Sequence, residues 1–270
     1  MEAETLIEFI RNNKISIYGT GYVAGKFYAA LQLHRLTDQI DFFITSEGSE
    51  EQYKKCDVLS VNDNRVREAN ILVAVHESIK DEIVDNLCKN KCKNYLWINP
   101  ELLYAMIFGK PIQKNSSISI KDIWLKNQDD YELTVRYLAI ENYFGKNDYG
   151  FDMYKYVMAL FAKRQSAECR LSNFCSLINN WVTNGYDETK PSKILDNYYY
   201  IDGSHRIAIA LYFNQPTIKC DVYTNSENLK IIRNEMVSLS KKHADRWLDY
   251  RALKILEETK QRINSKYGLF

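Results

Sequence analysis

The stretch Lys14-Ile15-Ser16-Ile17-Tyr18-Gly19-Thr20-Gly21-Tyr22-Val23-Ala24 decides the fold of the N-terminal part of this chain. Its first five residues predict a short apolar strand, and apolar residues at helical spacing predict a helix that follows to about Arg35. Further strands are expected over residues 40–45, 57–61, 70–75 and 95–98, and helices over residues 4–12 and 77–89. Because strands and helices alternate, we predict a doubly wound α/β unit with a parallel sheet over residues 1–100.

The glycines of this stretch are spaced as in a phosphate-binding loop. Gly19-x-Gly21-x-x-Ala24 follows a strand and opens a helix, whose first N–H groups are free to bind a pyrophosphate. We therefore expect Gly19, Gly21 and Ala24 at a nucleotide site, with Glu47 near the place where an acid holds a ribose. Such a turn also serves simply to pack a helix on a sheet, and both interpretations stay open.

The pattern changes after residue 100. Residues 101–165 look mainly helical, and we expect them to form a connector. Residues 166–270 are expected to form a second domain with a helical tail over residues 227–265. Its other expected elements are helices over residues 168–182 and 205–213 and strands over residues 192–195, 198–201 and 218–223.

Composition limits the functions to consider. The chain has 270 residues, 46% of them hydrophobic, which is enough for a sizeable core. Its 36 Lys and Arg balance 35 Asp and Glu, which argues against a nucleic-acid partner but not against a small anionic ligand. We expect no signal peptide, no membrane partner and a cytoplasmic protein, since residues 1–13 mix acids with apolar residues and no long apolar stretch occurs. A homo-oligomer is compatible with this composition.

The six cysteines are expected to be reduced thiols. Cys88 and Cys92 stand four residues apart, where a helix would place both on one face. A metal site needs two more ligands of suitable spacing, and the sequence offers none. Small buried side chains are therefore the preferred interpretation.

A second motif, Asp202-Gly203-Ser204-His205-Arg206, lies between an expected strand and an expected helix. Glycine permits a sharp turn, and His205 and Arg206 then stand beside the free N–H groups of the helix start. Arginine adds a planar fork of donors that suits phosphate oxygens. The motif predicts an anion site whose natural ligand is phosphate. In the alternative interpretation Asp202 or Ser204 only caps the helix and Arg206 pairs with an acid.

At this motif the sequence resembles a known family. Residues 168–223 resemble the ParB/sulfiredoxin-type fold through the helix over residues 170–182, Asn184-Gly185-Tyr186-Asp187, a strand beginning near Pro191, and Tyr200 to Ala208. That resemblance implies an α+β domain that binds nucleotide phosphates at the turn. Residues 14–98 resemble the Rossmann-like domain that precedes sugar-modifying and acyl-transfer modules in bacterial surface-polysaccharide pathways.

Three branches of the family differ at the turn. Sulfiredoxins have a catalytic cysteine before the His-Arg pair, where this chain has Ser204, which supplies no thiolate. Chromosome-partitioning ParB proteins carry Gly-Glu-Arg-Arg and a following DNA-binding module, for which the tail after Thr224 is short. Free-serine kinases carry Asp-Gly-x-His-Arg, which Asp202 to Arg206 match.

The kinase resemblance implies phosphoryl transfer from ATP, with Mg²⁺, to a hydroxyl of a small metabolite such as an amino acid or a sugar derivative. It implies Glu168 as general base and Asp202 as a residue that shapes the turn or binds the metal. The residues implied to hold the phosphates are Gly203, Ser204, His205 and Arg206. Lys163 and Arg164 would meet an anionic substrate or form a solvated helix face.

Two other functions remain open. A nucleotide-binding regulator or scaffold needs no acid beside an acceptor. A nicotinamide-dependent enzyme predicts a catalytic Tyr-x-x-x-Lys in the second half, but the nearest match, Tyr22 to Lys26, lies in the first.

Overall fold

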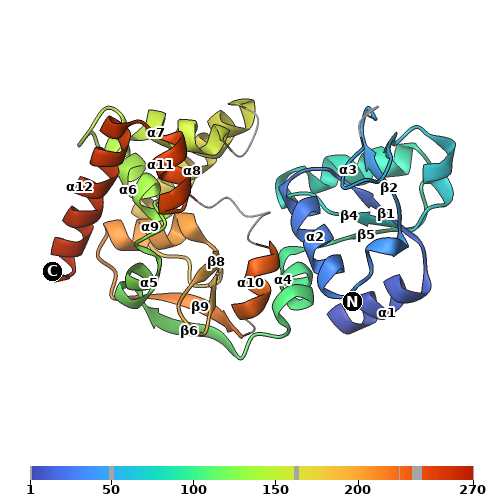
Figure 1. The fold of residues 1–270 in the computed structure, drawn as a ribbon, viewed down its shortest axis with the longest axis horizontal. Coiled ribbons are helices and arrows are strands. Elements are labelled where there is room, and N and C mark those ends of the chain that lie inside the picture. The colour runs from blue at the N-terminus through green and yellow to red at the C-terminus, as the bar shows by residue number, and fades with distance from the viewer. Residues whose placement is uncertain (1, 49–51, 161–163, 225, 233–238, 270) are drawn as a thin grey trace. The chain divides into compact units, whose positions relative to one another are not determined.

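The computed structural model describes residues 2–48, 52–160, 164–224, 226–232 and 239–269 (Figure 1). They form two compact units. The first comprises Met1–Lys110 and Asn225–Met236, and the second comprises Pro111–Thr224 and Val237–Phe270. The expected connector over residues 101–165 is therefore divided: residues 101–110 pack in the first unit, and the described residues between 111 and 165 pack in the second.

The first unit confirms the predicted α/β fold with a parallel sheet. Its five strands are β1 (Ile15–Tyr18), β2 (Ile40–Thr45), β3 (Val58–Ser60), β4 (Ile71–Val73) and β5 (Tyr95–Trp97). They are all parallel, in the order β3-β2-β1-β4-β5. From β1 the chain adds β2 and β3 on one side and then β4 and β5 on the other, so the strand order reverses between β1 and β4. At such a reversal, doubly wound folds open a crevice beside the carboxyl ends of the strands.

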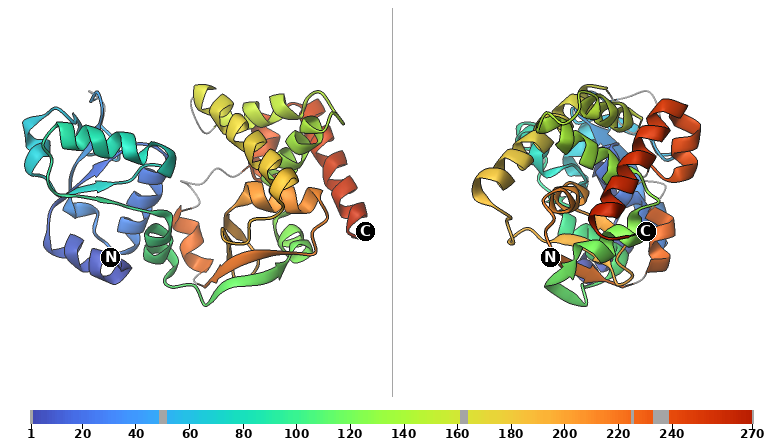
Figure 2. Two further views of the ribbon diagram at one scale, coloured as in Figure 1. Left: turned by 180° about the vertical axis from the view of Figure 1, so that it is seen from behind. Right: turned by 90° about the vertical axis from the view of Figure 1, so that its left-hand side faces the viewer.

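Helices cover both faces of this sheet. They are α1 (Ala3–Asn12), α2 (Tyr22–Leu33), α3 (Glu77–Lys89), α4 (Pro100–Phe108) and α10 (Leu229–Ile232), with 3-10 turns η1 (Thr37–Gln39), η2 (Asn64–Glu68) and η3 (Ser226–Asn228). Figures 1 and 2 show α3 on one face and α1, α2 and α4 on the other. Every residue of β1 and β4 is buried, as expected for strands covered on both sides.

The second unit contains a mixed sheet. Its strands are β6 (Gln113–Ser119), β7 (Ser192–Leu195), β8 (Tyr200–Asp202) and β9 (Thr217–Tyr223), in the order β6-β9-β7-β8. β7 and β9 are parallel, and the other pairs are antiparallel. Its helices are α5 (Ile120–Asn127), α6 (Glu132–Tyr143), α7 (Gly150–Ala159), α8 (Arg164–Asn184), α9 (Ser204–Tyr212), α11 (Lys241–Trp247) and α12 (Tyr250–Lys266).

The sequence failed to predict β6. Its residues, Gln-Lys-Asn-Ser-Ser-Ile-Ser, show no apolar alternation, because β6 is an edge strand with a largely exposed surface. The strand exists because it pairs with β9, regularly from Ser116 to Ser119 and with an irregularity between Gln113 and Ser116. β8 also begins later than expected, since Tyr198 has a positive φ of 66° and belongs to the turn before the strand.

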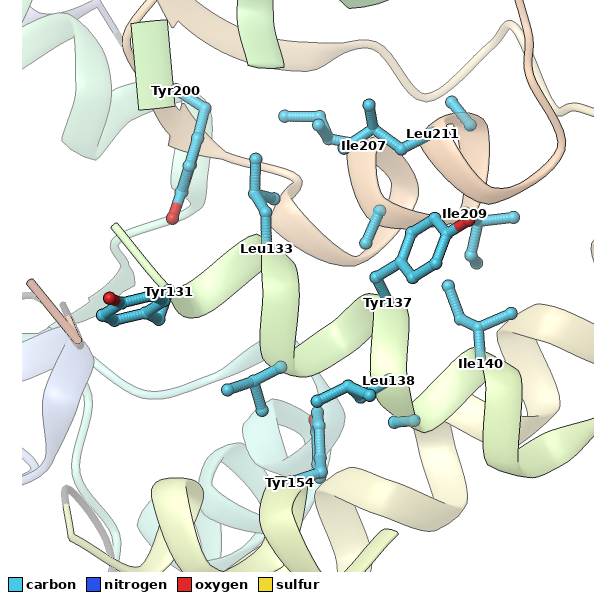
Figure 3. Close-up of a cluster of buried hydrophobic side chains, with 14 of the residues drawn as sticks. Tyr131, Leu133, Tyr137, Leu138, Ile140, Tyr154, Tyr200, Ile207, Ile209 and Leu211 are labelled. Carbon is cyan, nitrogen blue, oxygen red and sulfur yellow. The ribbon is translucent and has the colours of Figure 1, made fainter. Parts of the chain in front are cut away.

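Helix α6 lies at the centre of the second unit's core. All nine residues from Glu132 to Ile140 are buried, so the helix is enclosed on every side. Figure 3 shows Leu133 and Tyr137 of α6 facing Ile207 and Ile209 of α9, the helix that begins at the Asp202–Arg206 turn. The core thus holds α6 directly against the predicted site.

Two further expectations concern the chain as a whole. Within the described ranges, no helix combines the length and the apolar character needed to cross a membrane. All six cysteines are free thiols, and Cys88 is exposed whereas Cys92, beyond the end of α3, is buried.

The glycine loop of the first unit gives a stability test. We expect Gly19→Ala to lower the free energy of unfolding by about 1–3 kcal/mol, because Gly19 has a φ of +115° and a Cβ there would lie 2.9 Å from the carbonyl oxygen of Ala74. Gly21→Ala is the matched control, since its φ is −92° and no atom lies within 4 Å of an added Cβ. Calorimetric melting of both variants checks this, and equal losses would contradict it.

Candidate functional site

The Asp202–Arg206 turn joins β8 to α9 through a glycine that no other residue can replace without strain. Gly203 has a φ of +89°, and a Cβ there would lie 2.4 Å from Oγ of Ser192. The Gly203 N–H donates to Oδ1 of Asp202 at 2.8 Å. Helix α9 then starts at Ser204, so its first N–H groups have no partner within the helix. The structure therefore places Gly203, Ser204, His205 and Arg206 together at one helix start.

Two buried polar atoms at this turn have no hydrogen-bond partner among the described residues: Oγ of Ser192 and Nε of Arg206. Ser192 is fully buried, and its hydroxyl lies against Gly203. Arg206 makes one weak hydrogen bond, from Nη2 to the carbonyl oxygen of Pro191 at 3.3 Å. Since buried donors usually have partners, hydrogen bonding at this turn is incomplete.

A buried carboxylate lies behind the turn. Glu132, at the start of α6, accepts from Nη2 of Arg136 at 2.6 Å and from the hydroxyl of Tyr200 at 2.7 Å. Oγ of Ser204 lies 3.4 Å from the same carboxylate. Both members of the ion pair are almost inaccessible, with 4% of the Arg136 side chain and 7% of the Glu132 side chain exposed. This carboxylate is consequently a structural support, whose charge Arg136 already neutralises.

His205 is held as a neutral imidazole. Its Nε2 is hydrogen-bonded to the hydroxyl of Tyr154 at 2.8 Å, and its ring packs edge-on against Phe174, with centroids 4.5 Å apart. Burial lowers the pKa of His205 well below its ordinary value, and the charges of Arg136, Arg170 and Arg206 lower that pKa further. Because Glu132 balances the charge of Arg136, Arg170 and Arg206 are the arginines that add positive charge near this turn.

Asp202 and Glu168 differ in position. Asp202 is half-buried at the turn and uses one carboxylate oxygen for Gly203. Glu168 is exposed on α8 and pairs with Nζ of Lys155 at 3.4 Å. Phe174 is the α8 residue that contacts His205, and Glu168 lies about 9 Å from it along the helix axis. The structure thus brings Asp202, but not Glu168, to the turn. Lys163 lies outside the described residues, and Arg164 begins α8.

The residues present fit a Mg²⁺ ion carried by a nucleotide. Mg²⁺ is commonly bound by one or two carboxylates together with substrate phosphates. Asp202 offers one carboxylate at the turn, able either to ligate such an ion or to accept a proton. In the described part of the chain, no cluster of three or more His, Cys, Asp or Glu side chains forms a metal site of its own.

A small pocket adjoins the turn on the Arg206 side. Its volume is ≈ 70 Å³. The lining residues come from α8, from the loop after it and from the turn: Leu177, Asn180, Trp181, Gly185, Tyr186, Asp187, Lys190 and Arg206. Trp181 stacks on Tyr186 with centroids 4.7 Å apart. Lys190 and Arg206 bring two positive charges to this pocket, and Asp187 brings one negative charge.

In the first unit, the glycine loop lies at the point where the strand order reverses. The Gly19 N–H donates to the carbonyl oxygen of Ile44 at 2.8 Å, so the sheet already uses it. Gly21 caps α2 with open space around it, and Ala24 is fully buried. Glu47 is exposed after β2. Of the predicted nucleotide positions, Gly21 is open to a ligand, whereas Ala24 only makes room for helix packing.

Sequence reasoning missed four residues behind the turn: Glu132, Arg136, Tyr154 and Arg170. A signal was present for the first two. An acid and an arginine four residues apart, in a run of nine otherwise mostly apolar residues, indicate a buried ion pair on an enclosed helix. Tyr154 and Arg170 carry no such signal, since only the packing of α7 and α8 brings them near His205.

Comparisons with protein-family models, with curated proteins and with solved structures gave no match to this chain. The site must therefore be interpreted from its own geometry.

The buried ion pair gives a second test. We expect Arg136→Met to lower the free energy of unfolding of the second unit by about 3–5 kcal/mol, because it leaves the Glu132 carboxylate buried without its counter-charge. The double variant Glu132→Gln/Arg136→Met should be less destabilised, since a neutral amide replaces the carboxylate. Urea unfolding measures both, and a double variant at least as unstable as the single one would contradict the argument.

The neutral state of His205 predicts a pH dependence. Its lowered pKa means that, below about pH 6.5, the unfolded chain binds a proton that the folded chain does not. Stability from this residue is present above that pH and is lost as the pH falls, by up to about 1.4 kcal/mol per pH unit. Unfolding of wild type and His205→Gln from pH 7.5 to 5 should show a flatter profile in the variant, and parallel profiles would disprove this.

Proposed function

We propose that the second unit is a ParB/sulfiredoxin-like domain that binds ATP at the Asp202–Arg206 turn and transfers its γ-phosphoryl group to a hydroxyl of a small metabolite. The observation that carries the proposal is the turn itself. A glycine in the left-handed conformation opens a helix start, beside the partnerless buried atoms Ser192 Oγ and Arg206 Nε. Phosphate oxygens are the ligands that such donors favour.

The roles of the residues follow from their positions. The N–H groups at the start of α9 and the Arg206 guanidinium would hold the phosphates. The acceptor oxygen forms a bond to the γ-phosphorus, and the bond from that phosphorus to the β–γ bridging oxygen breaks with its electron pair left on ADP. The hydroxyl proton passes to Asp202, the acid at the turn. His205 remains neutral and, tied to Tyr154, fixes the first turn of α9.

A nucleotide-binding regulator without transfer activity is the second candidate. The observation in its favour is the state of the two glutamates. Glu132 is neutralised by Arg136, and Glu168 is exposed and paired with Lys155. Asp202 then remains as the acid on which turnover would depend.

Nucleotide binding and turnover separate these candidates. We expect Arg206→Ala to weaken ADP binding about tenfold or more in calorimetry, because charge-assisted hydrogen bonds contribute about 1.5–3 kcal/mol. Arg206→Lys should recover only part of the loss, since an ammonium lacks the planar fork. Arg251→Ala, an exposed arginine on α12, is the matched control and should bind as wild type does.

Turnover is followed by ³¹P NMR with ATP, Mg²⁺ and a panel of amino acids and sugars. The phosphotransferase predicts acceptor-dependent ADP, lost in Asp202→Asn and retained in Glu168→Gln. Loss of turnover in Glu168→Gln but not in Asp202→Asn would assign the role of general base to Glu168. ADP binding without turnover would favour the regulator, and absence of binding in the wild type would refute the phosphate site.

A further inference from the structure

An open hollow lies along α8 in the second unit. Its volume is ≈ 370 Å³, within the range of small-molecule pockets. Six lining residues come from one face of α8 and the seventh from the end of α6: Cys175, Ser176, Asn179, Asn180, Thr183, Asn184 and Tyr143. We call this hollow the amide groove, after its three asparagines.

The exposed face of α8 is unusual for a solvated helix. No residue from Leu171 to Tyr186 is charged, although 26% of the whole chain is. Most positions that face solvent are occupied by serine, asparagine and threonine, and Val182 is exposed among them. These residues stabilise a helix less than alanine, lysine or glutamate do, because their side chains compete for backbone hydrogen bonds. Helix stability therefore does not account for this composition, and a ligand does.

The chemistry of the groove selects that ligand. Amides and hydroxyls both donate and accept hydrogen bonds without charge, so they match a neutral molecule that carries several hydroxyls. An anion would favour lysine or arginine, and an apolar ligand would favour an apolar lining. Tyr143 adds a phenol ring at the edge of the groove. A neutral sugar is the small molecule that combines these requirements.

We propose that the amide groove binds a neutral sugar and that this sugar is the phosphoryl acceptor. The acceptor role rests on the proposed function, whereas sugar binding does not. Asn180 connects the two regions, since it lines both the amide groove and the pocket beside Arg206. A sugar in the groove would therefore adjoin the pocket that Arg206 lines. Its hydroxyl oxygen bonds to the γ-phosphorus as ADP leaves, and its proton passes to Asp202.

Direct binding tests the groove without ATP. Saturation-transfer NMR and calorimetry are run on the full chain with glucose, galactose and N-acetylglucosamine. Asn179→Ala and Thr183→Ala should each weaken sugar binding about tenfold, a change of about 1.4 kcal/mol. Because alanine favours helix, neither variant should melt below the wild type, so a loss of binding is not a loss of folding.

Asn173→Ala is the matched control. Asn173 is an exposed asparagine of the same helix that does not line the groove, so its variant should bind sugar as wild type does. The groove proposal would be wrong if all three variants weakened sugar binding equally. It would also be wrong if the wild type bound ADP but no sugar, and that result would leave the proposed phosphate site unaffected. Sugar bound in the groove but never phosphorylated, while another acceptor is, would overturn the acceptor role. Phosphorylation of the bound sugar, lost in Asn179→Ala, supports both.

Discussion

The second unit depends on one buried ion pair. The Glu132 carboxylate receives Arg136 from its own helix, the Tyr200 hydroxyl from β8 and the Ser204 hydroxyl from α9. Two parts of the chain that are distant in sequence, α6 and the β8–α9 segment, therefore meet on one group. Removing two charges from water is costly, and the hydrogen bonds from Tyr200 and Ser204 to the carboxylate offset part of that cost. Those bonds hold the start of β8 and the start of α9 on one group, on either side of the turn between them.

The same pair controls the electrostatics of the turn. A lone carboxylate behind Ser204 would repel a phosphate, but Arg136 neutralises it. The charges of Arg170 and Arg206 and the positive end of α9 then decide the sign of the field. Burial lowers the pKa of His205 most, and the neighbouring cations lower it further. A bound anion would offset these positive charges.

The two glycine turns of the chain illustrate how a similar motif serves different purposes. Gly19 and Gly203 each follow a strand, precede a helix and have positive φ. The N–H of Gly19 is used by the sheet, and an added Cβ would meet the backbone of Ala74. At Gly203 the nearest atoms are a buried hydroxyl and an arginine, both polar and incompletely bonded. The turn at Gly19 mainly lets α2 pack on the sheet, whereas the turn at Gly203 brings hydrogen-bond donors together.

By itself, the sequence determined the alternation of strands and helices in the first unit and the strand–turn–helix at Asp202 to Arg206, because local patterns of apolar residues and glycines specify them. It could not determine β6, whose polar residues become a strand only by pairing with β9. It could not place Glu132, Tyr154 or Arg170 beside the turn, nor Glu168 away from it. Those positions depend on how α6, α7 and α8 pack. Packing brings together residues that are far apart in the sequence, and a local sequence pattern does not predict which ones meet.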